Sequence, residues 1–272
     1  MYKIGWFSTG RGKGSQGLLR AAHDAIESGD LKARIAFVFL SREPGEAPQT
    51  DKFIQQVRSY NIPLVYLSYQ KYKACYGTAG EENADSLPQW RREYDRRVME
   101  LLKDFQTDIC VLAGYMLIVG AEVCTAYKMI NLHPAAPGGP TGTWREVIWR
   151  LIDARARETG VMMHLVTPQL DKGPVVTYTT FDISGEPYDG LWEQIKGKTA
   201  ARLKTAEGED NALFKLIRQH GMARELPLVI ATLKAFSQGK VKVVDGRVLD
   251  GQGKPVNGYD LTSEIEERLK SQ

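Results

Sequence analysis

The sequence has no long hydrophobic run. Its longest uncharged apolar stretch, residues 109–121, contains two glycines and is shorter than the roughly 18 residues that a membrane-spanning helix needs. Polar and glycine residues from position 8 onward also leave no apolar core for a signal peptide. We therefore expect a cytoplasmic protein without a membrane partner.

Cysteine and excess charge are also scarce. The 3 cysteines have no metal-binding or CxxC spacing, which predicts reduced thiols that pack as small hydrophobes. Lys and Arg number 36 against 33 Asp and Glu, and the net charge of +3 is too small for a protein whose main partner is a nucleic-acid backbone. A small anion is the better-matched ligand.

Short apolar runs alternate with amphipathic stretches along the first half of the chain. The runs, at 4–8, 35–40, 64–67 and 109–112, are nearly continuous, as in strands buried on both faces of a parallel sheet. Residues 90–105 repeat apolar side chains every three or four positions, which predicts a helix whose charged side chains face solvent. The polar, aperiodic stretches 69–87 and 185–190 predict surface loops or insertions.

The second half predicts further strands and a hairpin. Residues 161–166 and 175–183 have strand patterns, and the second alternates like a half-exposed edge strand, which can be antiparallel. Asp245-Gly246 predicts a hairpin between 241–244 and 247–249, and a helix over 263–270 closes the chain. We therefore expect an α/β, Rossmann-like fold: a mostly parallel twisted sheet with helices on both faces and a C-terminal β-hairpin and helix.

A glycine-rich segment follows the first predicted strand. Gly12, Gly14 and Gly17 form a literal GxGxxG that leads into a helical pattern at 18–22. Glycines let the backbone approach an anion, and a helix N-terminus offers N–H groups, so a phosphate can bind here. A dinucleotide site and a tight turn without a ligand stay open, although the acidic residues precede the second strand, which counts against the dinucleotide.

Two polar-tipped strands carry a second signal. Asn131 and His133 alternate onto one side of an extended segment that ends at Pro134, and a later strand leads into an acidic turn at Asp171. A converging amide, imidazole and carboxylate can perform acyl transfer, because the amide and a protonated imidazole stabilise an oxyanion and the carboxylate sets the imidazole charge. Taken alone, each of these residues could be purely structural, and His164 in the later strand is predicted to be a buried, hydrogen-bonded support.

Together these segments resemble the formyltransferase family that uses 10-formyltetrahydrofolate, and within it the branch that formylates glycinamide ribonucleotide in purine synthesis. The matching segments follow the family order from the first strand to about Gly258, and they are 12–16, 111–116, 131–134, 164–175, 227–230 and the hairpin. The resemblance implies a single formyltransferase domain, 1–272. Its expected parts are an N-terminal phosphate-binding half at 1–105, a folate-binding and catalytic half at 106–258 and a C-terminal helix at 259–272.

The resemblance also implies a role for individual residues. Catalysis is expected from Asn131, His133 and Asp171, which should meet in one cleft at the carboxyl ends of the strands. The acceptor phosphate is expected at Gly12, Gly14, Ser15 and Gln16, and the pterin at the backbone of Met116, Leu117, Ile118 and Val119 and at Gln169 and Leu170. The implied cosubstrate is 10-formyltetrahydrofolate and the implied partner is a small phosphorylated amine, with no metal and no nucleic acid; no oligomeric state is predicted.

The chain departs from the family pattern around the acceptor. Met222 stands where the family has a glutamate near the substrate amine, and Glu225, one turn away, is a candidate for amine recognition. Residues 135–144 replace the usual Leu-Pro segment, and Gln16 and Leu117 replace a usual Asn and Arg. Two alternatives therefore stay open: a formyltransferase for another amine, such as a nucleotide amino sugar, and a nucleotide-binding protein that performs no transfer.

Overall fold

The computed structural model describes residues 1–76 and 87–271. Its strands are β1 Tyr2–Ser8, β2 Ala33–Leu40, β3 Leu64–Tyr66, β4 Ile109–Leu112, β5 Met129–His133, β6 Glu158–Leu165, β7 Val175–Asp182, β8 Val241–Val244, β9 Arg247–Asp250 and β10 Tyr259–Asp260. Its helices are α1 Lys13–Glu27, α2 Pro48–Ser59, α3 Tyr69–Tyr76, α4 Gln89–Leu102, α5 Ala121–Ala126, α6 Trp144–Asp153, α7 Asp189–Gln194, α8 Ala200–Ala206, the short 3₁₀ helix η1 Gly208–Asp210, α9 Ala212–Ser237 and α10 Thr262–Lys270.

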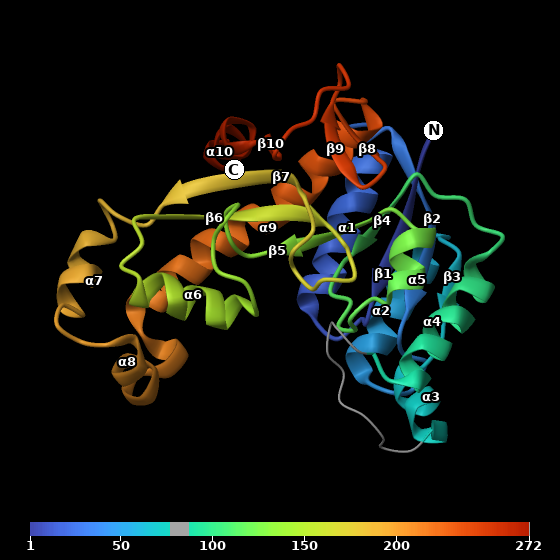
Figure 1. The fold of residues 1–272 in the computed structure, drawn as a ribbon, viewed down its shortest axis with the longest axis horizontal. Coiled ribbons are helices and arrows are strands. Elements are labelled where there is room, and N and C mark those ends of the chain that lie inside the picture. The colour runs from blue at the N-terminus through green and yellow to red at the C-terminus, as the bar shows by residue number, and fades with distance from the viewer. Residues whose placement is uncertain (77–86, 272) are drawn as a thin grey trace. The chain divides into compact units, whose positions relative to one another are not determined.

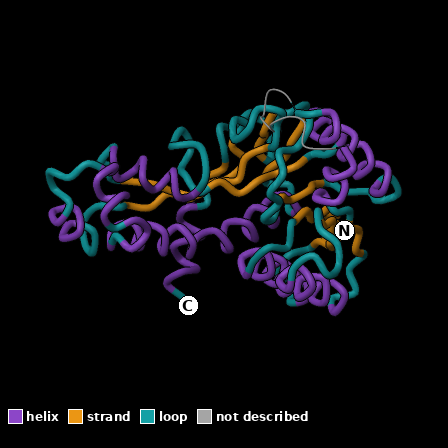
Figure 2. Tube along the Cα trace, turned by 90° about the horizontal axis from the view of Figure 1, so that it is seen from below, coloured by secondary structure: helices purple, strands orange, loops and turns teal. Residues whose placement is uncertain are grey.

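Eight strands form one sheet in the order β10-β7-β6-β5-β4-β1-β2-β3 (Figure 1). β1 pairs in parallel with both β2 and β4, and β4 pairs in parallel with β5. Helices cover both faces of these strands (Figure 2). The predicted mostly parallel, Rossmann-like sheet is confirmed, and buried apolar runs such as Ile109–Leu112 form strands because both of their faces are covered.

The chain divides into two compact units. The first contains Met1–Asn131, His164–Pro174 and Leu233–Pro255, and the second contains Leu132–Met163, Val175–Thr232 and Val256–Gln272. Each unit packs around its own cluster of buried apolar side chains. In the part of the chain that the structure describes, no helix combines the length and apolarity needed to cross a membrane.

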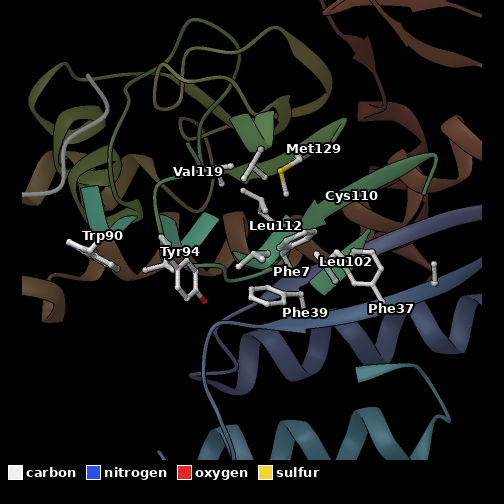
Figure 3. Close-up of a cluster of buried hydrophobic side chains, with 14 residues drawn as sticks. Phe7, Phe37, Phe39, Trp90, Tyr94, Leu102, Cys110, Leu112, Val119 and Met129 are labelled. Carbon is white, nitrogen blue, oxygen red and sulfur yellow. The ribbon is translucent and has the colours of Figure 1, made fainter. Parts of the chain in front are cut away.

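The core of the first unit is rich in aromatic rings (Figure 3). Phe7 on β1 contacts Phe37 and Phe39 on β2, with ring centroids 5.6 and 5.5 Å apart. Fully burying a side chain of this size contributes about 1.5–3 kcal/mol. Cys110 lies in the same cluster, and burial raises the pKa of its thiol to about 12, so it packs as the small hydrophobe that the sequence predicts.

The stretch 69–87, expected to be a surface loop or insertion, begins with helix α3 instead. The Ser68 hydroxyl accepts the N–H of Lys71 at 3.1 Å and so caps the first turn. Tyr72 then packs edge-on against the Tyr94 ring of α4, with centroids 5.4 Å apart. The loop prediction is therefore wrong for Tyr69–Tyr76, where tertiary packing outweighs the weak local pattern, and positions 77–86 lie outside the described residues.

Two charged residues of α4 are buried rather than solvated. Arg91 is 0% and Asp95 is 4% exposed, although the sequence assigned the charged residues of this helix to a solvent-facing side. They pair with each other at i,i+4 spacing, whereas Arg96 on the same helix is exposed as expected. The solvated-face interpretation is therefore wrong for this one pair.

The second half of the sheet agrees with the prediction except at its edge. The Leu165 N–H donates to the Pro174 carbonyl and the Ile183 N–H donates to the Arg157 carbonyl. The end of β6 therefore lies beside the start of β7 and the start of β6 beside the end of β7, so the two strands are antiparallel. β7 is not an edge strand, because the two-residue strand β10 pairs with it in parallel. Such a short strand leaves no pattern in the sequence, and the expected loop at 185–190 likewise ends early where α7 begins at Asp189.

The predicted hairpin is confirmed. β8 and β9 pair antiparallel through a turn in which Asp245 and Gly246 both have positive φ, 48° and 71°. This is the geometry that a two-residue hairpin turn of the Asp-Gly type requires.

Candidate active site

The glycine-rich segment forms the turn between β1 and α1. The helix begins at Lys13, earlier than the expected start near residue 18, with Gly12 as an N-cap that has extended backbone angles. No side chain caps this end, the first turn contains no acidic residue, and the first intrahelical N–H is that of Gln16, bonded to Gly12 O at 3.4 Å. The N–H groups of Lys13, Gly14 and Ser15 therefore precede the helical ladder, an arrangement that suits an anion.

The side chains of this turn are used for packing. Ser15 is buried, and a Cβ built at Gly114 would lie only 2.4 Å from its Oγ, so the hydroxyl packs directly on that glycine backbone. The Gln16 amide donates to the carbonyl of Gln49 in α2 at 3.3 Å. At the phosphate site expected from Gly12, Gly14, Ser15 and Gln16, a ligand would therefore meet the backbone more than the side chains of Ser15 and Gln16.

Thr9 joins this turn to the segment that follows β4. Its N–H donates to Gly114 O at 3.0 Å, and its hydroxyl accepts the Met116 N–H at 3.0 Å and the Ser41 hydroxyl, also at 3.0 Å. All these contacts lie inside the first unit. The expected phosphate site and the expected pterin segment are therefore neighbours with fixed geometry.

The expected pterin segment presents alternate side chains to core and solvent. Leu117 and Val119 are 8% and 6% exposed and belong to the core cluster, whereas Met116 is 63% exposed. A ligand that binds here would meet backbone groups and the Met116 side chain. The expected replacement of a usual Arg by Leu117 agrees with a segment that binds its ligand through backbone groups.

Strand β5 carries the amide and the imidazole of the expected catalytic set. Asn131 is half-buried and pairs in register with Leu112 of β4, and His133 is 2% exposed. His133 Nε2 lies 2.9 Å from the carbonyl oxygen of Pro140, and because a carbonyl only accepts, this nitrogen carries a proton. The imidazole is therefore oriented by the loop that follows it.

Asp171 lies in the loop between β6 and β7, with a positive φ of 54°. Its carboxylate is 3.7 Å from Nε2 of His164, whose Nδ1 donates to the Leu165 carbonyl at 2.9 Å. His164 is 2% exposed, so it is the buried, hydrogen-bonded support that the sequence predicts. Asn131 and Asp171 belong to the first unit and His133 to the second.

The same loop exposes the two remaining residues expected at the pterin. Gln169 and Leu170 are both exposed, and the Gln169 carbonyl accepts the Thr167 hydroxyl at 3.0 Å. Gly173 keeps the loop tight, because a Cβ there would lie 1.7 Å from the Leu165 carbonyl oxygen. The backbone near Asp171 is thus part of a closely packed turn.

The second unit contains a cavity beside Met222, the residue expected to replace a glutamate of the family. Its volume is about 420 Å³, and its lining includes Trp144, Phe214, Arg218 and Met222. The Arg218 guanidinium lies over the Trp144 ring, 4.5 Å from its centroid, and bonds the Glu225 carboxylate at 2.6 Å. Glu225, expected to recognise the amine, is therefore paired within the protein, a contact that only the fold reveals.

Across the described ranges, no cluster of three or more His, Cys, Asp or Glu side chains is arranged to hold a metal ion. The residues expected at the site offer an amide, two imidazoles, a carboxylate and a helix N-terminus. These groups suit proton transfer, oxyanion stabilisation and anion binding.

Comparison with known proteins gives a consistent result. Residues 10–199 match the family described as formyl transferase. A phosphoribosylglycinamide formyltransferase of Saccharomyces cerevisiae is 29% identical over 191 residues, which cover 66% of this chain and 85% of that protein. A formyltetrahydrofolate deformylase of Bacillus subtilis is 26% identical over 163 residues, 58% of this chain and 45% of that protein.

Solved structures share the fold. The phosphoribosylglycinamide formyltransferase of Coxiella burnetii superposes with a TM-score of 0.66 at 20% identity, covering 95% of this chain and 98% of that one. Since the family match spans most of the chain and includes the first strand-to-helix turn, β5 and the Asp171 loop, the chain belongs to the formyl transferase family.

Proposed function

We propose that this formyltransferase moves a formyl group from 10-formyltetrahydrofolate to the amine of glycinamide ribonucleotide in the cytoplasm. The observation that carries the proposal is the uncapped, acid-free start of α1, tied through Thr9 to the backbone at Met116. This pairing suits a phosphorylated acceptor beside a flat donor. The phosphoribosylglycinamide formyltransferases among the relatives support the same assignment.

In this proposal the two parts of the first unit bind different molecules. The acceptor phosphate meets the amides of Gly14 and Ser15 at the positive end of the α1 dipole. The pterin lies on the backbone of 116–119, with Gln169 and Leu170 beside it. The exposed Met116 side chain supplies apolar contact to the ring.

The chemistry is assigned to Asn131, His133 and Asp171. The acceptor nitrogen attacks the formyl carbon, and the carbonyl electron pair moves to oxygen, where the Asn131 amide and a protonated His133 stabilise the charge. Collapse of this intermediate expels the folate nitrogen, which takes a proton while the attacking nitrogen loses one. Asp171 favours the cationic imidazole and assists the proton movement.

A second acceptor is favoured by one observation. The Glu225 carboxylate is bonded by Arg218, and Met222 is 49% exposed in the neighbouring cavity. A thioether cannot pair with an ammonium group as a carboxylate does. The carboxylate expected to recognise the amine of glycinamide ribonucleotide is therefore already paired, which keeps another amine, such as a nucleotide amino sugar, as the second candidate, and the acceptor has to be tested directly.

The test follows loss of the formyl group from 10-formyl-5,8-dideazafolate by absorbance. We expect loss with glycinamide ribonucleotide and none without an acceptor. Loss with only a nucleotide amino sugar would move the assignment to the second acceptor, and acceptor-independent loss with release of formate would indicate a deformylase. Binding without any loss would refute formyl transfer.

A histidine pair provides the matched control. His133→Ala should lower the rate of transfer by about two orders of magnitude or more, because it removes a donor that acts on charge developing in the transition state. His23→Ala, at a ring that stacks on Tyr60 with centroids 3.7 Å apart, should leave transfer unchanged. Equal losses in both variants would indicate damage to the fold and would reject the catalytic role of His133.

A further inference from the structure

The buried ion pair of α4 holds the segment that follows β4. Arg91 bonds Asp95 with one terminal nitrogen and donates to the Ile118 carbonyl with the other at 2.8 Å. Asp95 accepts the Gly120 N–H at 2.9 Å through its second oxygen. Each side chain of the pair thus makes one contact with the other side chain and one with the backbone of residues 118–120.

Thr9 fixes the opposite end of the same segment by accepting the Met116 N–H at 3.0 Å. The stretch 116–120 is therefore held at three backbone groups, by the side chain of Thr9 and by two side chains of α4. A ligand that forms hydrogen bonds to this backbone must use groups other than these three, such as the N–H and C=O of Leu117. The contacts thereby define which edge of the segment is left to a ligand.

The pair is costly by itself. The Arg91 and Asp95 side chains are 0% and 6% exposed, and a buried pair of charges is often no more stabilising than apolar residues of similar volume. Gly120 shows how close the contact is, since a Cβ there would lie 2.6 Å from Asp95 Oδ2. A gain in stability is therefore a weak explanation for such an arrangement, whereas a fixed backbone conformation agrees with its contacts to Ile118 and Gly120.

We propose that Arg91 and Asp95 are positioning residues that pre-organise the 116–120 backbone for the folate donor. The inference rests on the proposed function, because it takes this segment as the pterin site. Neither side chain needs to touch the donor. Trp90 and Tyr94, each one residue before a member of the pair on α4, lie in the core cluster with Val119 and keep the helix in place (Figure 3).

The pair predicts a defect in donor binding that is separate from stability. In a double variant, Arg91→Met with Asp95→Leu, the core stays apolar and filled, so the melting temperature should fall only as far as the loss of partners for the Ile118 carbonyl and the Gly120 N–H requires. If the segment then spends only about a tenth of its time in the binding conformation, the Kd for the donor rises about tenfold. Acceptor affinity should not change.

An exposed ion pair on the same helix is the matched control. Arg96 bonds Glu122 of α5 through two nitrogens, at 2.7 and 3.0 Å, and both side chains are about half exposed. It links α4 to the region after the same segment without contacting the 116–120 backbone in these bonds. Arg96→Gln with Glu122→Gln should therefore leave donor affinity unchanged.

The experiment measures binding of 10-formyl-5,8-dideazafolate and of glycinamide ribonucleotide by calorimetry, together with amide hydrogen exchange at Ile118–Gly120 in the ligand-free protein. We expect weaker donor binding, unchanged acceptor binding and faster exchange in the Arg91/Asp95 double variant, and none of these in the control. Wild-type donor affinity in that variant, or a parallel loss of both ligands and of melting temperature, would overturn the proposal.

Two further outcomes are decisive. If the double variant does not fold, Arg91→Lys decides, because one ammonium cannot reach Asp95 and Ile118 as a fork does; a folded Lys variant with wild-type donor affinity would refute positioning. If the wild type binds no donor, the proposed function fails, and amide exchange alone then shows whether the pair fixes this backbone.

Discussion

Alanine substitutions in α1 separate binding from folding. Gly14 lies in the first turn and Gly17 one turn later, and a Cβ at either position would meet no atom within 4 Å. Neither glycine has positive φ, so alanine fits both backbones. In the ligand-free protein the two substitutions should therefore be equally tolerated.

The expected effect on stability is a gain. Alanine is favoured over glycine inside a helix by about 0.5–1 kcal/mol, chiefly because glycine loses more backbone entropy on folding. For a chain of this size the melting temperature should rise by about 1–3 °C in each variant.

The expected effect on the acceptor differs between the two sites. If the phosphate approaches the Gly14 backbone closely, a methyl group there displaces it from at least one charge-assisted hydrogen bond, worth about 1.5–3 kcal/mol. The KM for glycinamide ribonucleotide should then rise about tenfold to hundredfold in Gly14→Ala. Gly17→Ala should keep the wild-type KM.

Steady-state kinetics with glycinamide ribonucleotide and 10-formyl-5,8-dideazafolate, paired with thermal unfolding, provide the assay. The reasoning is refuted if Gly14→Ala binds the acceptor as the wild type does. It is refuted equally if Gly17→Ala loses as much affinity, because that would mean the helix, and not the contact, had changed.

Other substitutions and conditions give further tests. His133→Ala should lower turnover by about two orders of magnitude or more with little change in donor Kd, as measured by single-turnover kinetics and calorimetry. Met116→Asp, at an exposed position, should weaken donor binding and leave the melting temperature unchanged, whereas Leu117→Asp, at a core position, should cost more than about 3 kcal/mol in urea unfolding. Glu225→Gln should raise the acceptor KM if the substrate is glycinamide ribonucleotide, and an unchanged KM would remove it from amine recognition. The pKa of Cys110, about 12, keeps its thiol neutral from pH 7 to 9, so it should resist alkylation in the native protein and react only as pH approaches 12 or as the chain unfolds, as followed by mass spectrometry.

The sequence predicts most strands because local patterns of apolar residues indicate which strands are buried. Ile109–Leu112 is apolar throughout, and Asp245-Gly246 needs two positive φ angles that few other pairs adopt so readily. These signals depend on a few consecutive residues. They hold without knowledge of what lies across the sheet.

The features that escaped prediction depend on partners distant in the chain. Arg91 has the spacing and neighbours of a solvated charge, and its bond to the Ile118 carbonyl, 27 residues away, is not visible in the local pattern. Helix α3 depends on Tyr94 packing against Tyr72, which no local periodicity signals. The proximity of Asp171 to His164 similarly depends on how a short loop folds back on β6.

The contact between His133 and Pro140 restricts how this enzyme could change its substrate. The resemblance implies that residues 135–144 depart from the family pattern, and the Pro140 carbonyl within them orients the imidazole at 2.9 Å. A proline offers only its carbonyl, so this contact cannot reverse its direction. Replacing this loop with the corresponding loop of a relative would therefore change the substrate selectivity and the reactivity of His133 together. A replacement that keeps the enzyme active would have to supply another acceptor for the Nε2 proton of His133.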